Sequence, residues 1–195
     1  MKALLKPAIT ACSIMALSGC ISLTPEPPES LLTLTATDMA AVGSQTSGTA
    51  ANAIAVMEPE TPQSLNVTRV PVQIDATGVA YVENAVWVEK PARLFQRLLA
   101  ETIRARSGRF VTDGDESAIV PENRLRGTLR EFGFDARTGS VVVRYDAVRT
   151  GPDRAVQTRR FESVQPGILP EAGPVGEALN RGANDVAGQV AAWVG

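Results

Sequence analysis

The sequence contains no histidine and only two cysteines, Cys12 and Cys20. Without histidine, neither a Ser-His-Asp nor a Cys-His catalytic arrangement can be built, and the commonest transition-metal ligand is missing. A zinc site made only of carboxylates would be atypical, and no nucleophile motif of the G-x-S-x-G type occurs. We therefore expect no enzyme activity, no metal site and no bound cofactor.

The sequence also lacks a hydrophobic run long enough to span a bilayer, which needs about 20 apolar residues. Its mostly apolar stretch, Ala8 to Leu17, follows the positive charges of Lys2 and Lys6 and precedes two small residues. This layout is typical of a secretory signal peptide. We assign residues 1–19 to this signal.

The signal ends in Leu17-Ser18-Gly19-Cys20, which resembles the lipobox of bacterial lipoproteins. The resemblance implies cleavage between Gly19 and Cys20, with a diacylglycerol on the cysteine sulfur and a third acyl chain on the freed amine. Two acyl chains already anchor a protein stably, so three should hold it on a membrane. An ordinary cleaved signal is the alternative. Ile21 stands where an aspartate retains many lipoproteins in the inner membrane, so the resemblance favours the inner leaflet of the outer membrane.

Charge and cysteine content constrain the mature chain further. Removal of Lys2 and Lys6 changes the net charge from −2 to −4, and Cys20 is the only cysteine left, so no disulfide can form within one chain. A mildly acidic chain gives no reason to expect nucleic-acid binding. Lys90 is the only lysine of the mature chain, which has sixteen arginines. Coding bias is one explanation of this excess, and the other is that some guanidinium groups bind phosphate or carboxylate.

After a proline-rich tether at residues 20–30, the hydrophobic pattern predicts one domain over 31–195, with a flexible loop at 38–51. Expected helices span 91–106, with leucines and other apolar residues at three-and-four spacing, and 175–194. Pro71 marks the strand at 67–74 as an edge strand, because proline cannot donate to a ladder. Expected strands cover 31–35, 52–57, 67–74, 79–88 with a turn at Asn84, 109–112, 124–134, 140–149 and 158–164.

The order of these elements predicts an α+β fold, in which a mixed or mostly antiparallel sheet carries two helices packed on one face. In the strand at 124–134 the apolar residues change phase, from Leu125 and Leu129 to Phe132 and Phe134. A β-bulge near Arg130 would restore the phenylalanines to the core. Gly127 is expected where a helix packs closely on this strand.

From Ala53 onward the chain resembles the ABC-type transport auxiliary lipoproteins, the PqiC-like or YmbA-like group. A tyrosine and a tryptophan precede the long helix, an L-x-G-x-L-x-x-F strand begins the hairpin, and the terminal helix ends near Trp193. The stretches that carry the resemblance are NAIAVMEP, YVENAVWVEKPARLFQRLLAETI, NRLRGTLREFGFD, TRRFES and ALNRGANDVAGQVAAWV.

This resemblance implies a lipid-anchored periplasmic accessory of an ABC transport system with an MCE-domain protein, which moves lipids or other hydrophobic molecules across the envelope. The expected partners are the MCE-domain protein, the ABC permease and ATPase components and the membrane, and a homo-oligomer is compatible with the role. The accessory would act by docking and binding. An outer-membrane assembly or envelope-scaffold lipoprotein is the main alternative, and a periplasmic hydrolase is disfavoured.

Several residues are candidates for partner binding, and each has a structural alternative. Tyr81 and Trp87 could form a binding platform or, more simply, pack in the core. Asp113, Asp115 and Glu116 have the wrong spacing for a calcium loop and indicate a turn. A third group could line a basic sheet face for an acidic partner or lipid headgroups, or could form an ordinary solvated face: Arg126, Arg130, Arg144, Arg159 and Arg160.

Overall fold

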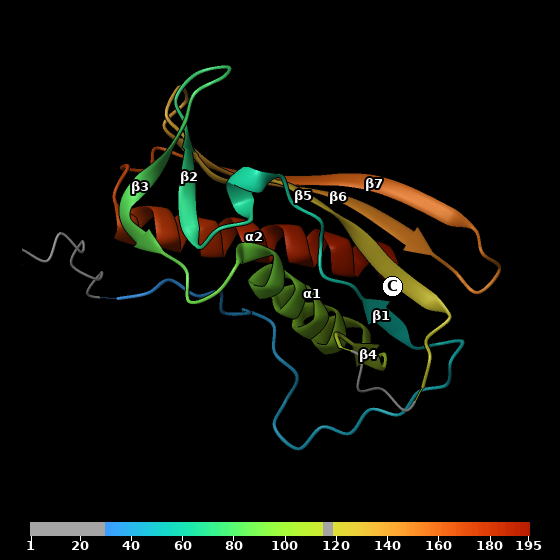
Figure 1. The fold of residues 1–195 in the computed structure, drawn as a ribbon. Helices are drawn as coiled ribbons and strands as arrows, with labels where there is room; N and C mark the ends of the chain where they lie inside the picture. Colours follow the sequence, from blue (N-terminus) through green and yellow to red (C-terminus); the bar gives the residue numbers. More distant parts are fainter. Residues whose placement is uncertain (1–29, 115–118) are drawn as a thin grey trace, which may run out of the picture.

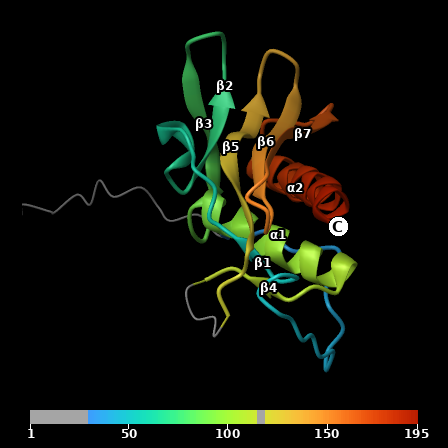
Figure 2. The same cartoon turned by 90° about the vertical axis from the view of Figure 1, so that its right-hand side faces the viewer.

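The computed structural model describes residues 30–114 and 119–195 and confirms the predicted α+β class. A seven-stranded mixed sheet carries both helices on one face, as Figures 1 and 2 show from two directions. Cys20 and the whole predicted signal and tether up to Glu29 lie outside the described residues. The elements are β1 (Ile54–Val56), the 3-10 helix η1 (Gln63–Leu65), β2 (Arg69–Gln73), β3 (Val79–Val86), α1 (Pro91–Ser107), β4 (Val111–Thr112), β5 (Asn123–Asp135), β6 (Ser140–Thr150), β7 (Val156–Pro166) and α2 (Ala172–Val194).

Strand β5 is the centre of the sheet. On one side it forms an antiparallel meander with β6 and then β7. On its other side it pairs in parallel with β2 near Phe134 and with β1 near Asn123. Strand β3 extends the sheet beyond β2, and β4 extends it beyond β1. The predicted bulge is confirmed, because the β5–β6 register shifts between Leu129 and Glu131.

Both helices follow their predicted faces. α1 begins with Pro91 in its first turn and ends at Gly108, whose φ of 61° suits glycine at a helix end. The core between the helices and the sheet includes Phe95 of α1, Phe132 of β5 and Leu179 of α2, each at most 1% exposed. One face of the sheet is thus sealed by packing, which leaves the opposite face to solvent.

Three local predictions are wrong. β2 is not an edge strand, since it lies between β3 and β5. Pro71 is tolerated there because it sits at the register shift with β3, after which parallel pairing with β5 begins at Val72. Asn84 makes no turn and continues β3 with a φ of 57°. Residues 31–35 form no full strand and contribute a single bridge, from Leu32 to Trp87.

The segment before β1 lies along the helices. The amides of Thr35 and Thr37 donate to the side chains of Asn180 and Asn184 of α2, at 2.9 and 2.7 Å. The amide of Ala40 donates to Glu101 of α1 at 2.8 Å. The chain therefore enters the domain along the helical layer, away from the open sheet face.

Candidate functional site

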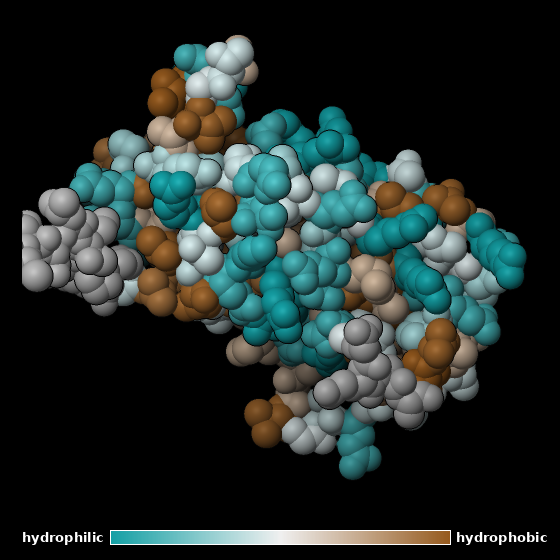
Figure 3. All heavy atoms as spheres, in the orientation of Figure 1, coloured by the Kyte–Doolittle hydropathy of each residue, from teal (hydrophilic) through white to brown (hydrophobic). Residues whose placement is uncertain are grey.

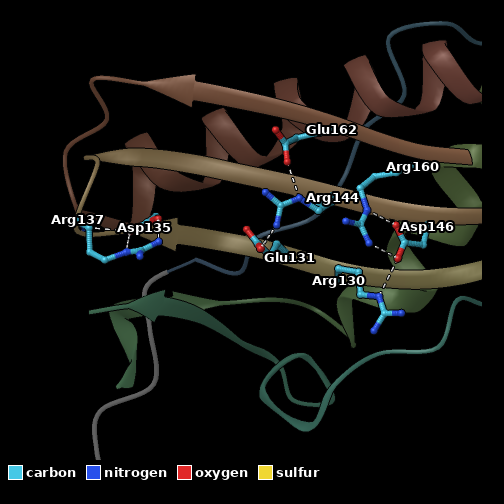
Figure 4. Close-up of polar contacts among 8 residues, drawn as sticks. All are labelled: Arg130, Glu131, Asp135, Arg137, Arg144, Asp146, Arg160 and Glu162. Atoms are coloured by element: carbon cyan, nitrogen blue, oxygen red, sulfur yellow. Dashed lines mark hydrogen bonds and ion pairs between the residues drawn. The ribbon is translucent and has the colours of Figure 1, made fainter. Parts of the chain in front are cut away.

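The face of β5, β6 and β7 that points away from the helices carries a network of ion pairs. Side chains alternate along a strand, so residues between the core-facing ones point away from the helices. On β6 the core-facing residues include Val143 and Tyr145, which places Arg144 and Asp146 on the open face. Figure 4 shows these residues with their partners from β5 and β7. We call this surface the open face.

Asp146 lies at the middle of one row of charges on the open face. Its carboxylate accepts from Nε and Nη2 of Arg160 on β7, at 2.6 and 2.8 Å, and from Nε of Arg130 on β5, at 2.9 Å (Figure 4). Hydrogen bonding from Arg160 above all lowers the pKa of Asp146 to about 2. Asp146 therefore stays ionised and neutralises two arginines together.

Arg144 lies at the middle of a second, adjacent row, in which a basic residue stands between two acidic ones. Its guanidinium pairs with Glu131 of β5 and, at 2.5 Å, with Glu162 of β7. At the end of the β5–β6 hairpin, Arg137 binds Asp135 of its own turn and holds the pKa of that carboxyl below its usual range. These contacts are exposed pairs, so each contributes little alone and they act as a network.

The predicted arginines therefore do not form one basic surface. Arg130 and Arg144 are neutralised within the open face. Arg159 belongs to the opposite side of β7, where its guanidinium carbon lies 5.1 Å from the ring centroid of Phe161. Arg126 is exposed on the open face and has no acidic partner among the described residues.

Sequence reasoning missed Arg124, which shares the open face of β5 with Arg126. Both side chains are exposed, two residues apart, and within the described ranges neither contacts a carboxylate. The spacing of two within a strand could have signalled this pair. Arg124 and Arg126 are thus the uncompensated positive charge of the open face, which we call the basic corner.

The two aromatic candidates have different environments. Trp87 is 1% exposed and packs against Phe132 with ring centroids 5.5 Å apart, so its ring belongs to the core. Tyr81 is half-buried, and the guanidinium carbon of Arg69 lies 3.8 Å from its ring centroid. A cation over an aromatic face is an attractive contact in itself. Neither ring presents a binding platform in this arrangement.

A pocket of about 370 Å³ is lined by residues of η1, β2, the β2–β3 turn and the β5–β6 hairpin. The pocket lining includes acidic and basic side chains, and Gly133 and Val142 also contribute to it. Within the described ranges no cluster of three acidic or cysteine side chains could hold a metal ion. Asp115 and Glu116 of the predicted turn lie outside those ranges. The charged lining residues are Asp75, Arg130, Glu131, Asp135 and Arg137.

On the face seen in Figure 3, hydrophobic residues lie only in small separate groups. Figure 3 shows hydrophilic residues over the middle of the visible face and hydrophobic residues in small separate groups, one of them at the projecting hairpin of β2 and β3. Ile74 and Val79 at this hairpin are 51% and 46% exposed. Among residues 30–114 and 119–195, no helix is both long and apolar enough to cross a membrane.

Comparison with known proteins identifies the family. Residues 32–191 match the family described as the ABC-type transport auxiliary lipoprotein component, and the chain belongs to this family. No curated protein matches the sequence.

Solved structures share the fold. A Xanthomonas campestris protein of family DUF330 is 13% identical with a TM-score of 0.66, and the match covers 85% of this chain and 94% of that one. An uncharacterized protein is 14% identical with a TM-score of 0.65, over 78% of this chain and 97% of the other. At these identities the likeness establishes the fold alone.

Proposed function

We propose that this chain is a lipid-anchored periplasmic accessory of an ABC/MCE-type system that moves lipids or other hydrophobic molecules across the envelope. The observation that carries the proposal is the family match from residue 32 onward, which begins twelve residues after the cysteine of the lipobox. A domain of a transport-accessory family thus follows the predicted lipid attachment signal. The favoured location is the inner leaflet of the outer membrane.

The anchor limits where the domain can act. If extended, residues 21–30 reach roughly 30 Å from the lipid at about 3.3 Å per residue. The domain therefore works close to one membrane and contributes a docking surface there, without chemistry of its own. The basic corner of Arg124 and Arg126 is our candidate docking surface, because its charge is not already neutralised within the chain.

Co-purification tests the transport role. The full chain with an affinity tag is recovered from cells after crosslinking of the native membranes, and its partners and lipids are identified by mass spectrometry. We expect an MCE-domain protein with an ABC permease or ATPase, and none of these with an unrelated tagged lipoprotein as the control. Recovery of outer-membrane assembly proteins in their place would support the scaffold alternative and contradict the proposal.

A separate experiment tests the anchor. Cys20→Ser removes the sulfur that would carry the diacylglycerol, so the variant should lose palmitate labelling and leave the membrane fraction. Cys12→Ser is the matched control, since this cysteine lies within the predicted signal, and it should label as the wild type does. Unchanged membrane fractionation of Cys20→Ser would contradict the lipid anchor.

A further inference from the structure

The outer edge of β7 is not paired with another strand in the described part of the chain, where the only strand that pairs with β7 is β6. The amide of Gly151 donates to the carbonyl of Ala155 at 3.1 Å, directly beyond the Thr150–Val156 pair. In an antiparallel ladder, hydrogen-bonded and non-hydrogen-bonded pairs alternate. The odd-numbered residues of β7 therefore bond to β6, and the even-numbered ones direct their backbone groups to the outer edge.

Two further features agree with this assignment. The carbonyl of Glu162 accepts from Nε2 of Gln189 on α2 at 3.3 Å, so it points away from β6. Pro166 has no N–H and falls in the even-numbered set, where β6 requires no donor. An edge of 11 residues thus offers backbone donors and acceptors to another strand.

The charges of the open face show what kind of strand fits this edge. One row runs Arg130, Asp146, Arg160 across β5, β6 and β7 (Figure 4). The neighbouring row runs Glu131, Arg144, Glu162. The charges alternate in sign along each row. On β7 the first row ends in the positive Arg160 and the second in the negative Glu162.

We propose that a second copy of this chain pairs with β7 in antiparallel orientation, centred on Phe161. In this register the outward-bonding Arg160 lies opposite Glu162 of the second copy, and Thr158 lies opposite Val164 of the second copy. Both charge rows then continue into the second copy without a break in alternation. Symmetric pairing centred on Arg160 or on Glu162 would place like charges opposite each other, which is destabilising.

The helices leave room for this arrangement. A Cβ on Gly182 of α2 would lie 3.1 Å from Val143 of β6 and 3.6 Å from Ser163 of β7, so α2 runs beneath the boundary between these strands. With strands about 4.8 Å apart, the two α2 helices would lie roughly 10 Å apart across the symmetry axis. This is the spacing of packed helices. The carbonyl of Glu162 has a second lone pair, so the bond from Gln189 does not prevent pairing.

Cysteine crosslinking in cells tests the register. The full chain is co-expressed with two different tags, one copy carrying Thr158→Cys and the other Val164→Cys, and the membranes are oxidised. We expect a mixed disulfide between the tagged copies. Each variant expressed alone is the control, because its two cysteines would lie about 20 Å apart, six residues along the strand. A parent without engineered cysteines controls for Cys20.

A second measurement separates pairing from folding. Thr158→Pro removes an outward donor without removing a bond to β6, whereas Thr158→Ala keeps the donor. The chain in detergent should self-associate roughly tenfold more weakly with proline than with alanine, because symmetry removes two hydrogen bonds. Circular dichroism should be the same for both. A monomeric wild type, no mixed disulfide, or crosslinks only to a different protein would overturn the proposal, which does not depend on the transport role.

Discussion

Substitution of Asp146 by asparagine should destabilise the domain, because this carboxylate neutralises two arginines. Asparagine keeps the size of the side chain and removes the charge, which leaves the guanidinium groups of Arg130 and Arg160 facing one another. The wild-type contacts are 2.6 and 2.8 Å to Arg160 and 2.9 Å to Arg130. The variant therefore isolates the electrostatic part of the network.

The magnitude follows from the pKa of Asp146, which lies at about 2. An ordinary aspartate has a pKa of about 3.9, and the difference corresponds to at most about 2.5 kcal/mol. The carboxylate is 24% exposed and Arg130 and Arg160 are more than half exposed, so solvent screening reduces this. We expect a loss of about 1 kcal/mol in the free energy of unfolding, or roughly 2–4 °C in Tm.

The pH dependence has a definite sign. Because the folded-state pKa is depressed, the stabilisation is complete above about pH 5 and is lost as the pH falls toward 2. Most of the difference of about 1 kcal/mol between wild type and Asp146→Asn should be lost by pH 3. Urea unfolding at pH 7, 5, 4 and 3, at one protein concentration, measures this difference directly.

Glu177→Gln is the matched control, since Glu177 is 79% exposed and lies 3.9 Å from its arginine partner. This variant should change the free energy of unfolding by less than about 0.5 kcal/mol at every pH. Equal stability of Asp146→Asn and wild type at pH 7 would refute the reasoning. A difference of the same size at pH 7 and pH 3 would also refute it, because the carboxylate charge would not then be its cause.

The remaining predictions concern the core and its polar groups. Gly127→Ala should lower the free energy of unfolding by more than about 3 kcal/mol, measured by urea unfolding. A Cβ at this position would overlap the carbonyl oxygen of Asp146 and lie 2.8 Å from the ring of Tyr145. A well-folded, equally stable variant would refute this close approach. Asn123→Ala should cost about 1–3 kcal/mol in the same assay, because it removes the two hydrogen bonds that the side-chain amide donates, at 2.7 and 3.0 Å, to the carbonyls of Ala51 and Ala53. No loss would show that these bonds contribute nothing. Tyr145→Phe should leave Tm unchanged or raise it slightly, because its buried hydroxyl has no hydrogen-bond partner in the described part of the chain; a loss above about 1 kcal/mol would contradict this.

Local patterns made part of the fold predictable. The three-and-four spacing in α1 and its glycine stop predicted that helix, and the phase change between Leu129 and Phe132 predicted the bulge in β5. Both signals are contained within one element, so they need no knowledge of neighbouring strands. The place of Pro71 was mispredicted because its tolerance depends on a register shift against β3, a contact between elements.

The site was predicted only in part, because its contacts form between elements. Gly127 was expected to face a helix, yet its close neighbours are Tyr145 and Asp146 of β6. The arginines were visible in the sequence, but their neutralisation depends on the register of β5, β6 and β7. One sequence signal could have indicated it: Arg144 and Asp146 on one strand, and Arg160 and Glu162 on the next, place opposite charges two residues apart on one face.

The central claim is that a lipid-anchored docking domain serves an ABC/MCE-type transport system. The most direct measurement is the molar ratio of MCE-domain protein to tagged chain recovered from crosslinked membranes, compared among wild type, Cys20→Ser and Arg124→Ala/Arg126→Ala. We predict a substantial ratio for wild type and a reduced ratio for both variants, with the double variant still in the membrane fraction. Absence of the MCE-domain protein from the wild-type sample, at full recovery of the tagged chain, would contradict the claim.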